Sequence, residues 1–320
     1  MKIIIYLLFL ILIKTIFLYN KNDIEKLVSY ISNEKAILIG AGAGLSLSAG
    51  FDFSGERFNK YFFDFHSKYN ITDMYSGSFY SFSKPSEFWA FMSRMIYLNR
   101  FSPFLKNTYY ILYEILKEKN YFILTSNADH LFQRAGFDKR RLYYMQGDMG
   151  LMQCKKPCHF INYDNYEIIK DMLIDQGFSF DKKGELIVGN NIKIEINEKL
   201  IPKCPKCGGE MDFNLRGDYN FVQDEGWYEH RKLYSDFIDK YKNEDILYIE
   251  IGVGYDTPSI IKYNFWSQVS NNKKAKFVSI NLEEIELPEN IRNQSLVLVE
   301  DADIIINKVY ELIKGNKSDL

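Results

Sequence analysis

Two short polar segments carry residue types that could do chemistry. The first is Thr125-Ser126-Asn127-Ala128-Asp129, and the second is Gln146-Gly147-Asp148. A carboxylate and an amide held near a reacting carbon can orient a substrate and stabilise developing positive charge. Gln146 is a neutral amide that does not titrate, so it cannot serve as a general base. Without their neighbours in sequence, however, Asn127 and Asp129 are more typical of a turn that caps a helix.

A glycine-rich loop lies earlier in the chain, at Gly40-Ala41-Gly42-Ala43-Gly44-Leu45-Ser46. Glycines after a strand let the backbone approach a pyrophosphate, and the N-terminus of the following helix favours its negative charge. The spacing differs from G-x-G-x-x-G, and no acidic residue follows where ribose binding requires one. The loop alone therefore indicates either a phosphate site or a tight strand-to-helix turn.

The four cysteines of the chain form two close pairs, Cys154 with Cys158 and Cys204 with Cys207. Two such pairs can complete a closed tetrahedral zinc site, whereas a secreted scaffold would use them as two disulfides. The paired spacing favours zinc. Four thiolates leave no open position for water, so we expect a structural metal without His159 as a ligand.

The elements that position these residues can be read from apolar runs. Five short runs predict buried parallel strands, at residues 36–39, 121–124, 246–251, 276–280 and 296–299. Helical patterns at 22–32, 107–119 and 304–314 alternate with them. This alternation predicts an α/β fold, a Rossmann-like parallel sheet with its ligand at the carboxyl ends of the strands.

Three segments do not follow that alternation. Residues 57–104 are rich in Phe, Tyr and Met at helical spacing, which predicts an inserted helical module. Residues 148–222 hold every cysteine, which predicts a small structural-zinc module. Residues 1–20 form an apolar leader interrupted by Lys14: a signal peptide, a membrane anchor or a start-site extension. The Rossmann-like domain would then comprise 21–56, 105–147 and 223–320.

In combination, these motifs resemble the sirtuins, a family of NAD⁺-dependent deacylases and ADP-ribosyltransferases. The glycine loop and the Thr125–Asp129 segment match, and Gln133-Arg134-Ala135-Gly136 follows. Later matches are Gly252-Val253-Gly254, Ile280-Asn281 and Asp301-Ala302-Asp303. The order of the motifs holds from about residue 23 to 313.

Two departures indicate one branch of that family. Gln146 stands where sirtuin deacylases carry a catalytic His, and Gly55-Glu56-Arg57-Phe58 follows the glycine loop. Both features resemble the macrodomain-linked (class M) sirtuins. The resemblance implies a protein ADP-ribosyltransferase that acts on a lipoylated carrier protein, with a macrodomain hydrolase as a further partner.

The resemblance also implies the site residues. The catalytic positions would be Asn127, Asp129 and Gln146, next to the nicotinamide ribose. NAD⁺ would contact Gly42, Ala43, Gly44, Ser46, Arg57, Phe58, Ser126, Asn127, Asp129, Gln146, Gly252, Val253, Gly254, Asn281, Asp301 and Ala302. His130 could replace the missing base, but on a strand its side chain would face away from Asp129, and a packing or surface role is the simpler interpretation.

Three other functions remain open at this stage: a lysine deacylase, an NAD⁺ hydrolase and a catalytically silent NAD⁺ or ADP-ribose sensor. The formal net charge of −2 gives no reason to expect a nucleic acid partner. NAD⁺ is a cytoplasmic cofactor, so we expect a cytoplasmic protein, tethered to a membrane or exported only if residues 1–20 act as an anchor or signal.

Overall fold

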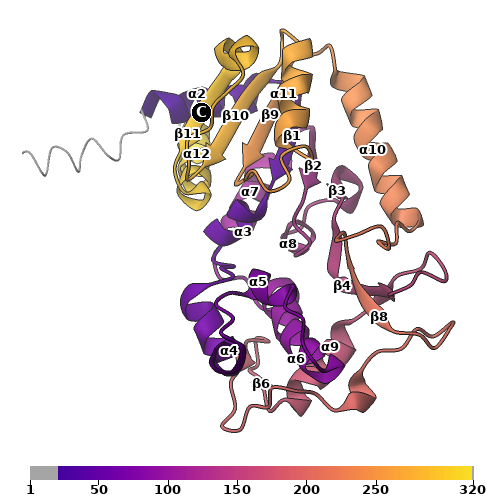
Figure 1. Cartoon of the computed structure of the whole chain (residues 1–320). Coiled ribbons are helices and arrows are strands. Elements are labelled where there is room, and N and C mark those ends of the chain that lie inside the picture. Colours follow the sequence, from indigo (N-terminus) through magenta and orange to yellow (C-terminus); the bar gives the residue numbers. More distant parts are fainter. Residues whose placement is uncertain (1–20, 319–320) are drawn as a thin grey trace, which may run out of the picture.

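The main sheet of the protein consists of six parallel strands. The computed structural model describes residues 21–318 (Figure 1). The strand order is β11-β10-β9-β1-β2-β3, and every neighbouring pair is parallel. The strands are β1 (Ala36–Ala41), β2 (Tyr121–Thr125), β3 (Leu142–Tyr144), β9 (Ile246–Ile251), β10 (Lys276–Asn281) and β11 (Ser295–Val299). The predicted α/β fold and its five strands are confirmed. The sixth strand, β3, has three residues and is too short to form an apolar run.

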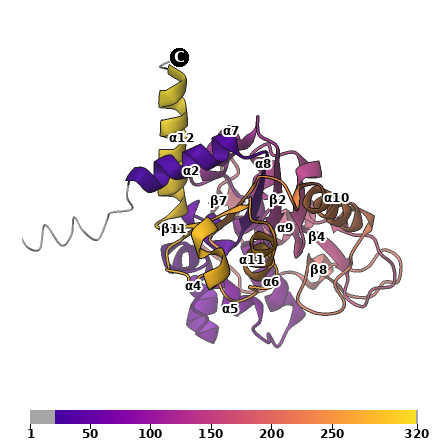
Figure 2. The ribbon, with the colours of Figure 1, turned by 90° about the horizontal axis from the view of Figure 1, so that it is seen from above.

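Helices cover both faces of this sheet (Figure 2). One face packs against α2 (Lys21–Asn33), α7 (Thr108–Leu116) and α12 (Ala302–Ser318), and the other against α10 (Glu225–Tyr241) and α11 (Lys262–Asn271). In β1, Ile37 and Ile39 join the first core, whereas Ala36 and Leu38 join the second. The alternation follows from the two-residue period of a strand and explains why the whole run is apolar.

The strand order reverses beside β1. The chain proceeds from β1 to β2 and β3 on one side, and from β9 to β10 and β11 on the other. At such a switch point the connections after the two central strands lead to opposite faces of the sheet and leave a crevice outside the carboxyl edge. The glycine loop after β1 and the Gly252 loop after β9 therefore border the same crevice.

A second body packs below the carboxyl edge of the sheet (Figure 1). Its helices are α4 (Gly55–Tyr69), α5 (Met74–Ser78), α6 (Pro85–Ile96) and α9 (Tyr166–Asp175), and its three-stranded sheet is β5 (Tyr163–Asp164), β4 (Gly147–Cys154) and β8 (Met211–Leu215). Phe58, Phe62, Phe65 and Phe91 fill its centre. The smaller elements of the chain are α3 (Ala43–Ser48), α8 (Leu131–Arg134), β6 (Ser179–Phe180), β7 (Leu186–Ile187), the π-helix η1 (Tyr97–Phe101) and the 3₁₀ helices η2 (Lys139–Arg141), η3 (Glu198–Leu200) and η4 (Glu289–Gln294).

The inserted helices and the cysteine-bearing segment share one hydrophobic core. Cys154, Cys204 and Met211 belong to the same buried cluster as Phe62 and Phe91. The boundary predicted between residues 147 and 148 falls at the start of β4. The division into domains remains a prediction, but these two segments pack as one body.

None of the helices within residues 21–318 has the length and apolar content needed to cross a bilayer. The predicted leader at residues 1–20 lies outside the described part of the chain.

Candidate active site

Two glycine loops touch each other at the switch point of the sheet. The amides of Gly42 and Gly44 donate hydrogen bonds to the carbonyls of Ile251 and Gly252, each at 3.0 Å. Gly252 has a left-handed backbone with φ of +60°. A Cβ atom there would lie 2.3 Å from the nitrogen of Leu45. These glycines are therefore required for the close approach of the two loops.

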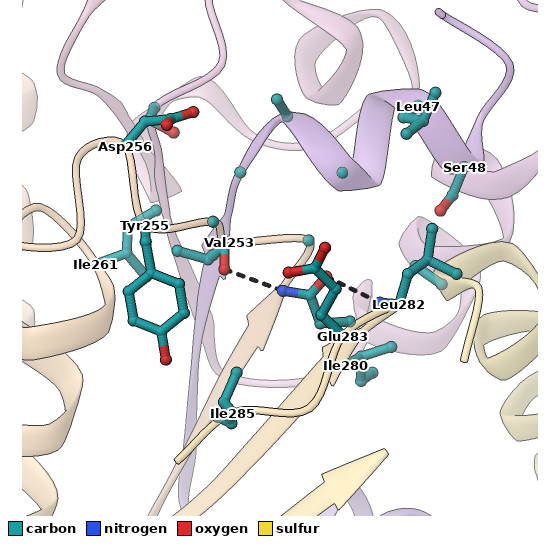
Figure 3. A pocket seen from close by; sticks show the side chains of 18 of the residues that line it. Leu47, Ser48, Val253, Tyr255, Asp256, Ile261, Ile280, Leu282, Glu283 and Ile285 are labelled. Carbon is teal, nitrogen blue, oxygen red and sulfur yellow. Dashed lines mark hydrogen bonds between the residues drawn. The ribbon is translucent and has the colours of Figure 1, made fainter. Parts of the chain in front are cut away.

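A cavity of about 440 Å³ opens where the loops meet (Figure 3). Nine of the predicted cofactor-binding residues line it, namely Gly42, Ala43, Gly44, Ser126, Gly252, Val253, Gly254, Asn281 and Ala302. The sequence did not identify Tyr255, Glu283 or Glu300, which also line it. Asn281 connects the loop after β9 to the segment after β10. Its Nδ2 donates to the carbonyl of Val253 at 3.1 Å, and its Oδ1 accepts from the amide of Leu282 at 2.8 Å.

Ser46 connects polar residues that do not line this cavity. Its Oγ donates to Oδ2 of Asp129 at 2.5 Å, and it lies 2.9 Å from the hydroxyl of Tyr109. Because the Ser46 proton is directed to the carboxylate, Tyr109 must donate in the second contact. The backbone amide of Leu131 donates to Oδ1 of Asp129 at 3.0 Å. Burial raises the pKa of the Asp129 carboxyl, although both hydrogen bonds oppose the shift.

Asn127 is fixed in one orientation by the same network. Its Nδ2 donates to the carbonyl of Gly42 at 3.0 Å and to Oγ of Ser46 at 3.1 Å. These two contacts use both amide hydrogens, so Oδ1 of Asn127 is the atom left to accept a further hydrogen bond. Asn127 and Asp129 line a small recess together with His130 and Asp148. The recess begins next to Ser126, a wall residue of the larger cavity.

His130 does not lie on a strand, so the reason for expecting its side chain to face away from Asp129 does not hold. It precedes α8 with a left-handed backbone at φ of +62°. This conformation directs Nδ1 to within 2.8 Å of Oδ2 of Asp148. Arg100 holds the opposite oxygen of Asp148, with an Nε–Oδ1 distance of 2.6 Å. The sequence offered no sign of either contact, because the three residues come from separate elements.

The remaining predicted residues lie away from the cavity wall. Gln146 lies in the turn before β4, where its carbonyl accepts from the amide of Arg216 at 3.0 Å. Asp301 accepts from the amide of Asp303 at 2.7 Å at the start of α12. Phe58 has no exposed surface and stacks on Phe62 with ring centroids 5.1 Å apart.

Arg57 is occupied by its own neighbours. Its guanidinium donates to Oδ1 of Asn99 at 2.8 Å and to the carbonyl of Leu98, and it covers the ring of Phe51. Burial lowers the pKa of Arg57 to about 10. In this arrangement neither Arg57 nor Phe58 lines the cavity, so contact with a dinucleotide would require α4 to move.

The four cysteines converge as predicted. All four Sγ atoms lie within 4.8 Å of one another. Sγ of Cys154 is 3.6 Å from that of Cys207, and Sγ of Cys158 is 3.7 Å from that of Cys204. These distances are far longer than a disulfide bond, at about 2.05 Å. They match the sulfur separation of roughly 3.8 Å expected around tetrahedral zinc with Zn–S bonds of about 2.3 Å. The cluster therefore fits a structural zinc ion.

Comparison with known proteins adds independent findings. No family model matches the chain. A protein ADP-ribosyltransferase from Staphylococcus aureus is 33% identical over 283 residues, covering 88% of this chain and 85% of that protein. The chain belongs to the protein ADP-ribosyltransferase family. A protein from Fusarium oxysporum f. sp. cubense, named as a probable bifunctional ADP-ribose hydrolase/ADP-ribosyltransferase, is 28% identical over 73% of this chain but only 38% of its own length.

Solved structures identify the fold of this ADP-ribosyltransferase family member as that of Sir2 enzymes. Sir2Af2 bound to a myristoylated histone peptide aligns with a TM-score of 0.54 and 20% identity, over 94% of this chain and 100% of its own. A complex of Sir2 with a p53 peptide and NAD⁺ aligns with a TM-score of 0.53 and 18% identity, over 90% and 97%. The resemblance to sirtuins inferred from the sequence is confirmed.

The contact between the glycine loops gives a first test of the site in this family member. Gly252→Ala would place a side chain on a left-handed backbone and within 2.3 Å of the Leu45 nitrogen. Strain of this kind costs about 1–3 kcal/mol, so we expect NAD⁺ affinity to fall by about tenfold or more in calorimetric titration. Gly217→Ala is a control, because a Cβ there meets nothing within 4 Å. Unchanged affinity in Gly252→Ala would contradict the proposed role of the loop contact.

Proposed function

We propose that this chain cleaves the bond between the nicotinamide and the ribose of NAD⁺ and transfers the ADP-ribosyl group to a protein. One observation carries the proposal. Ser126 lines the 440 Å³ cavity, and the next residue, Asn127, lines the recess that also contains Asp129. A dinucleotide whose adenosine half occupies the cavity would bring its other end to this polar recess.

The side chains of the recess suit a reaction in which positive charge develops. Loss of neutral nicotinamide leaves positive character on C1′ of the ribose, which nearby negative charge stabilises. Oδ1 of Asn127 can accept a hydrogen bond from a ribose hydroxyl, because both amide hydrogens are already used. Asp129 is buried and bonded to Ser46, so its carboxylate would act over a distance and through Ser46.

Gln146 supports transfer rather than deacylation. Sirtuin-type deacylation needs a base to take a proton from a ribose hydroxyl, and an amide cannot do this. Gln146 would bind the ribose without accepting its proton. The name of the S. aureus relative, which covers 88% of this chain, points to the same reaction.

The acceptor and the further partner follow from the sequence motifs and from the Fusarium relative. The motifs around Gln146 and Arg57 resemble the macrodomain-linked branch, which supports a lipoylated carrier protein as acceptor. The Fusarium relative combines ADP-ribose hydrolase and ADP-ribosyltransferase in its name, which supports a hydrolase as a functional partner. The use of NAD⁺ supports a cytoplasmic location.

The experiment that tests this function compares three acceptors. The protein is incubated with NAD⁺ labelled in its adenosine half, and with an acetylated peptide, a lipoylated carrier protein or buffer alone. We expect mass spectrometry to find ADP-ribose on the carrier. A deacetylated peptide with O-acetyl-ADP-ribose would instead indicate a deacylase, and free ADP-ribose in buffer a hydrolase. Intact NAD⁺ in every tube would indicate a silent NAD⁺ or ADP-ribose sensor.

A further inference from the structure

The four cysteines of the cluster differ in their exposure to solvent. Cys154 and Cys204 are each 2% exposed, whereas Cys158 and Cys207 lie at the surface. A zinc ion held by four thiolates forms a site of net negative charge, because the thiolates outweigh the metal. Hydrogen bonds from outside the ligand set orient the ligands and tune the metal. Such contacts matter most for the two surface thiolates, which water can reach.

Backbone amides supply these contacts to three of the four sulfur atoms. Sγ of Cys154 accepts from the amide of Cys158, and Sγ of Cys204 accepts from the amide of Cys207. The amide of Gly209 donates to Sγ of Cys207 at 3.4 Å. These donors belong to the same turns that carry the ligands, so the folding of each turn stabilises its own thiolate.

The donor described for Cys158 is instead a side chain. Nδ1 of His159 lies 2.9 Å from Sγ of Cys158. A metal-bound thiolate carries no proton and can only accept, so the hydrogen of this contact must lie on Nδ1. In the neutral ring the lone pair is then on Nε2. The surface ligand of the first cysteine pair therefore depends on the orientation of one imidazole.

Tyr163 holds that imidazole in place. Its hydroxyl lies 2.8 Å from Nε2 of His159, and the two rings meet edge to face with centroids 5.6 Å apart. Because Nε2 of the neutral ring accepts, the hydroxyl donates. Tyr163 belongs to β5 and pairs with Met152 of β4, the strand that ends at the ligand Cys154. The contact to Cys158 is thus anchored to the sheet.

We propose that His159, held by Tyr163, is a positioning residue that keeps the exposed Cys158 thiolate on the zinc ion. The inference concerns the metal site and does not depend on the reaction proposed above. The hydrogen bond disperses negative charge from the sulfur and restricts it to the position that faces the metal. Loss of an outer contact of this kind typically weakens metal binding by about 10- to 100-fold. His159 acts as a donor and not as a ligand, because four thiolates already complete a tetrahedral site.

Transfer of zinc from the folded protein to a coloured chelator, pyridylazoresorcinol, tests the proposal. We expect His159→Phe, which keeps an aromatic ring but has no donor, to release zinc about tenfold faster than wild type. His159→Asn places an amide nitrogen where Nδ1 lies and should stay within about twofold of wild type. Tyr163→Phe loses one hydrogen bond and should release zinc about fivefold faster. Phe160→Ala is the control, since this neighbouring side chain is 75% exposed, and it should match wild type.

Cobalt distinguishes a hydrogen bond to sulfur from simple packing of the loop. With Co²⁺ in place of zinc, the charge-transfer absorption from sulfur to metal moves to lower energy when a thiolate loses a donor. We expect this shift in His159→Phe and not in His159→Asn. Unchanged zinc release in His159→Phe, or faster release without a shift of the cobalt band, would overturn the proposal. Circular dichroism reports whether each variant folds; if His159→Phe does not, the same two measurements on Tyr163→Phe decide.

Discussion

Asn127→Ala is expected to lower the rate of nicotinamide release at saturating NAD⁺ by about 100- to 1,000-fold, the range measured for loss of one oriented polar group at a reacting centre. The substitution removes the Oδ1 atom that would accept from the ribose. It also removes the amide that donates to the carbonyl of Gly42 at 3.0 Å and to the hydroxyl of Ser46 at 3.1 Å, although Ser46 keeps Tyr109 as a donor. The substitution would thus remove a direct contact with the ribose and also the hydrogen bonds that hold Gly42 and Ser46 in place.

The measurement is the release of nicotinamide over time, which is monitored by chromatography. Asn290→Ala is a suitable control, since Asn290 lies exposed on η4 and bonds only Ser270 among the contacts described for its side chain. The control should match wild type. A rate within about threefold of wild type in Asn127→Ala would show that the recess is not where the bond breaks.

Cys204→Ser is expected to release zinc and to lower the melting temperature by at least about 10 °C. Cys204 is 2% exposed and belongs to the core that also contains Phe62 and Phe91. Structural zinc contributes on the order of 10 kcal/mol to the folding of small modules, and 1 kcal/mol corresponds to roughly 2–4 °C in a larger domain. Because the core is shared, loss of the metal should also loosen α4 and α6.

Zinc content by atomic absorption and melting by circular dichroism test this prediction. Lys206→Ser, between the cysteines of the second pair, is exposed and should keep its zinc. Chelation of wild type should reproduce the effect of Cys204→Ser. A Cys204→Ser protein with wild-type zinc content and stability would contradict a four-thiolate site.

The parts of the site that depend on local sequence were predictable. Local sequence determines the geometry of three parts of the site. These are the glycines at 42 and 44, the Thr125–Asp129 segment and the two cysteine pairs. The apolar runs predicted the strands for the same reason, since a strand buried on both faces must be apolar throughout. Nine residues expected at the cofactor line the cavity.

The parts that depend on tertiary contacts were not predictable. Arg100, His130 and Asp148 come from different elements, and neither their spacing in the sequence nor the composition indicates that they are in contact. Arg57 was expected at the cofactor, but it bonds Asn99 and Leu98. Phe58 was expected there too, but the amphipathic α4 buries it in an aromatic core.

Exchange of labelled nicotinamide into NAD⁺ tests the central claim most directly, because it reports cleavage of the bond at C1′ without any protein acceptor. Wild-type protein is incubated with unlabelled NAD⁺ and ¹⁴C-nicotinamide, and the NAD⁺ is isolated and counted. Our account predicts label in NAD⁺, formed as free nicotinamide re-adds at C1′, and loss of that exchange in Asn127→Ala. NAD⁺ that binds the protein but gains no label would contradict it.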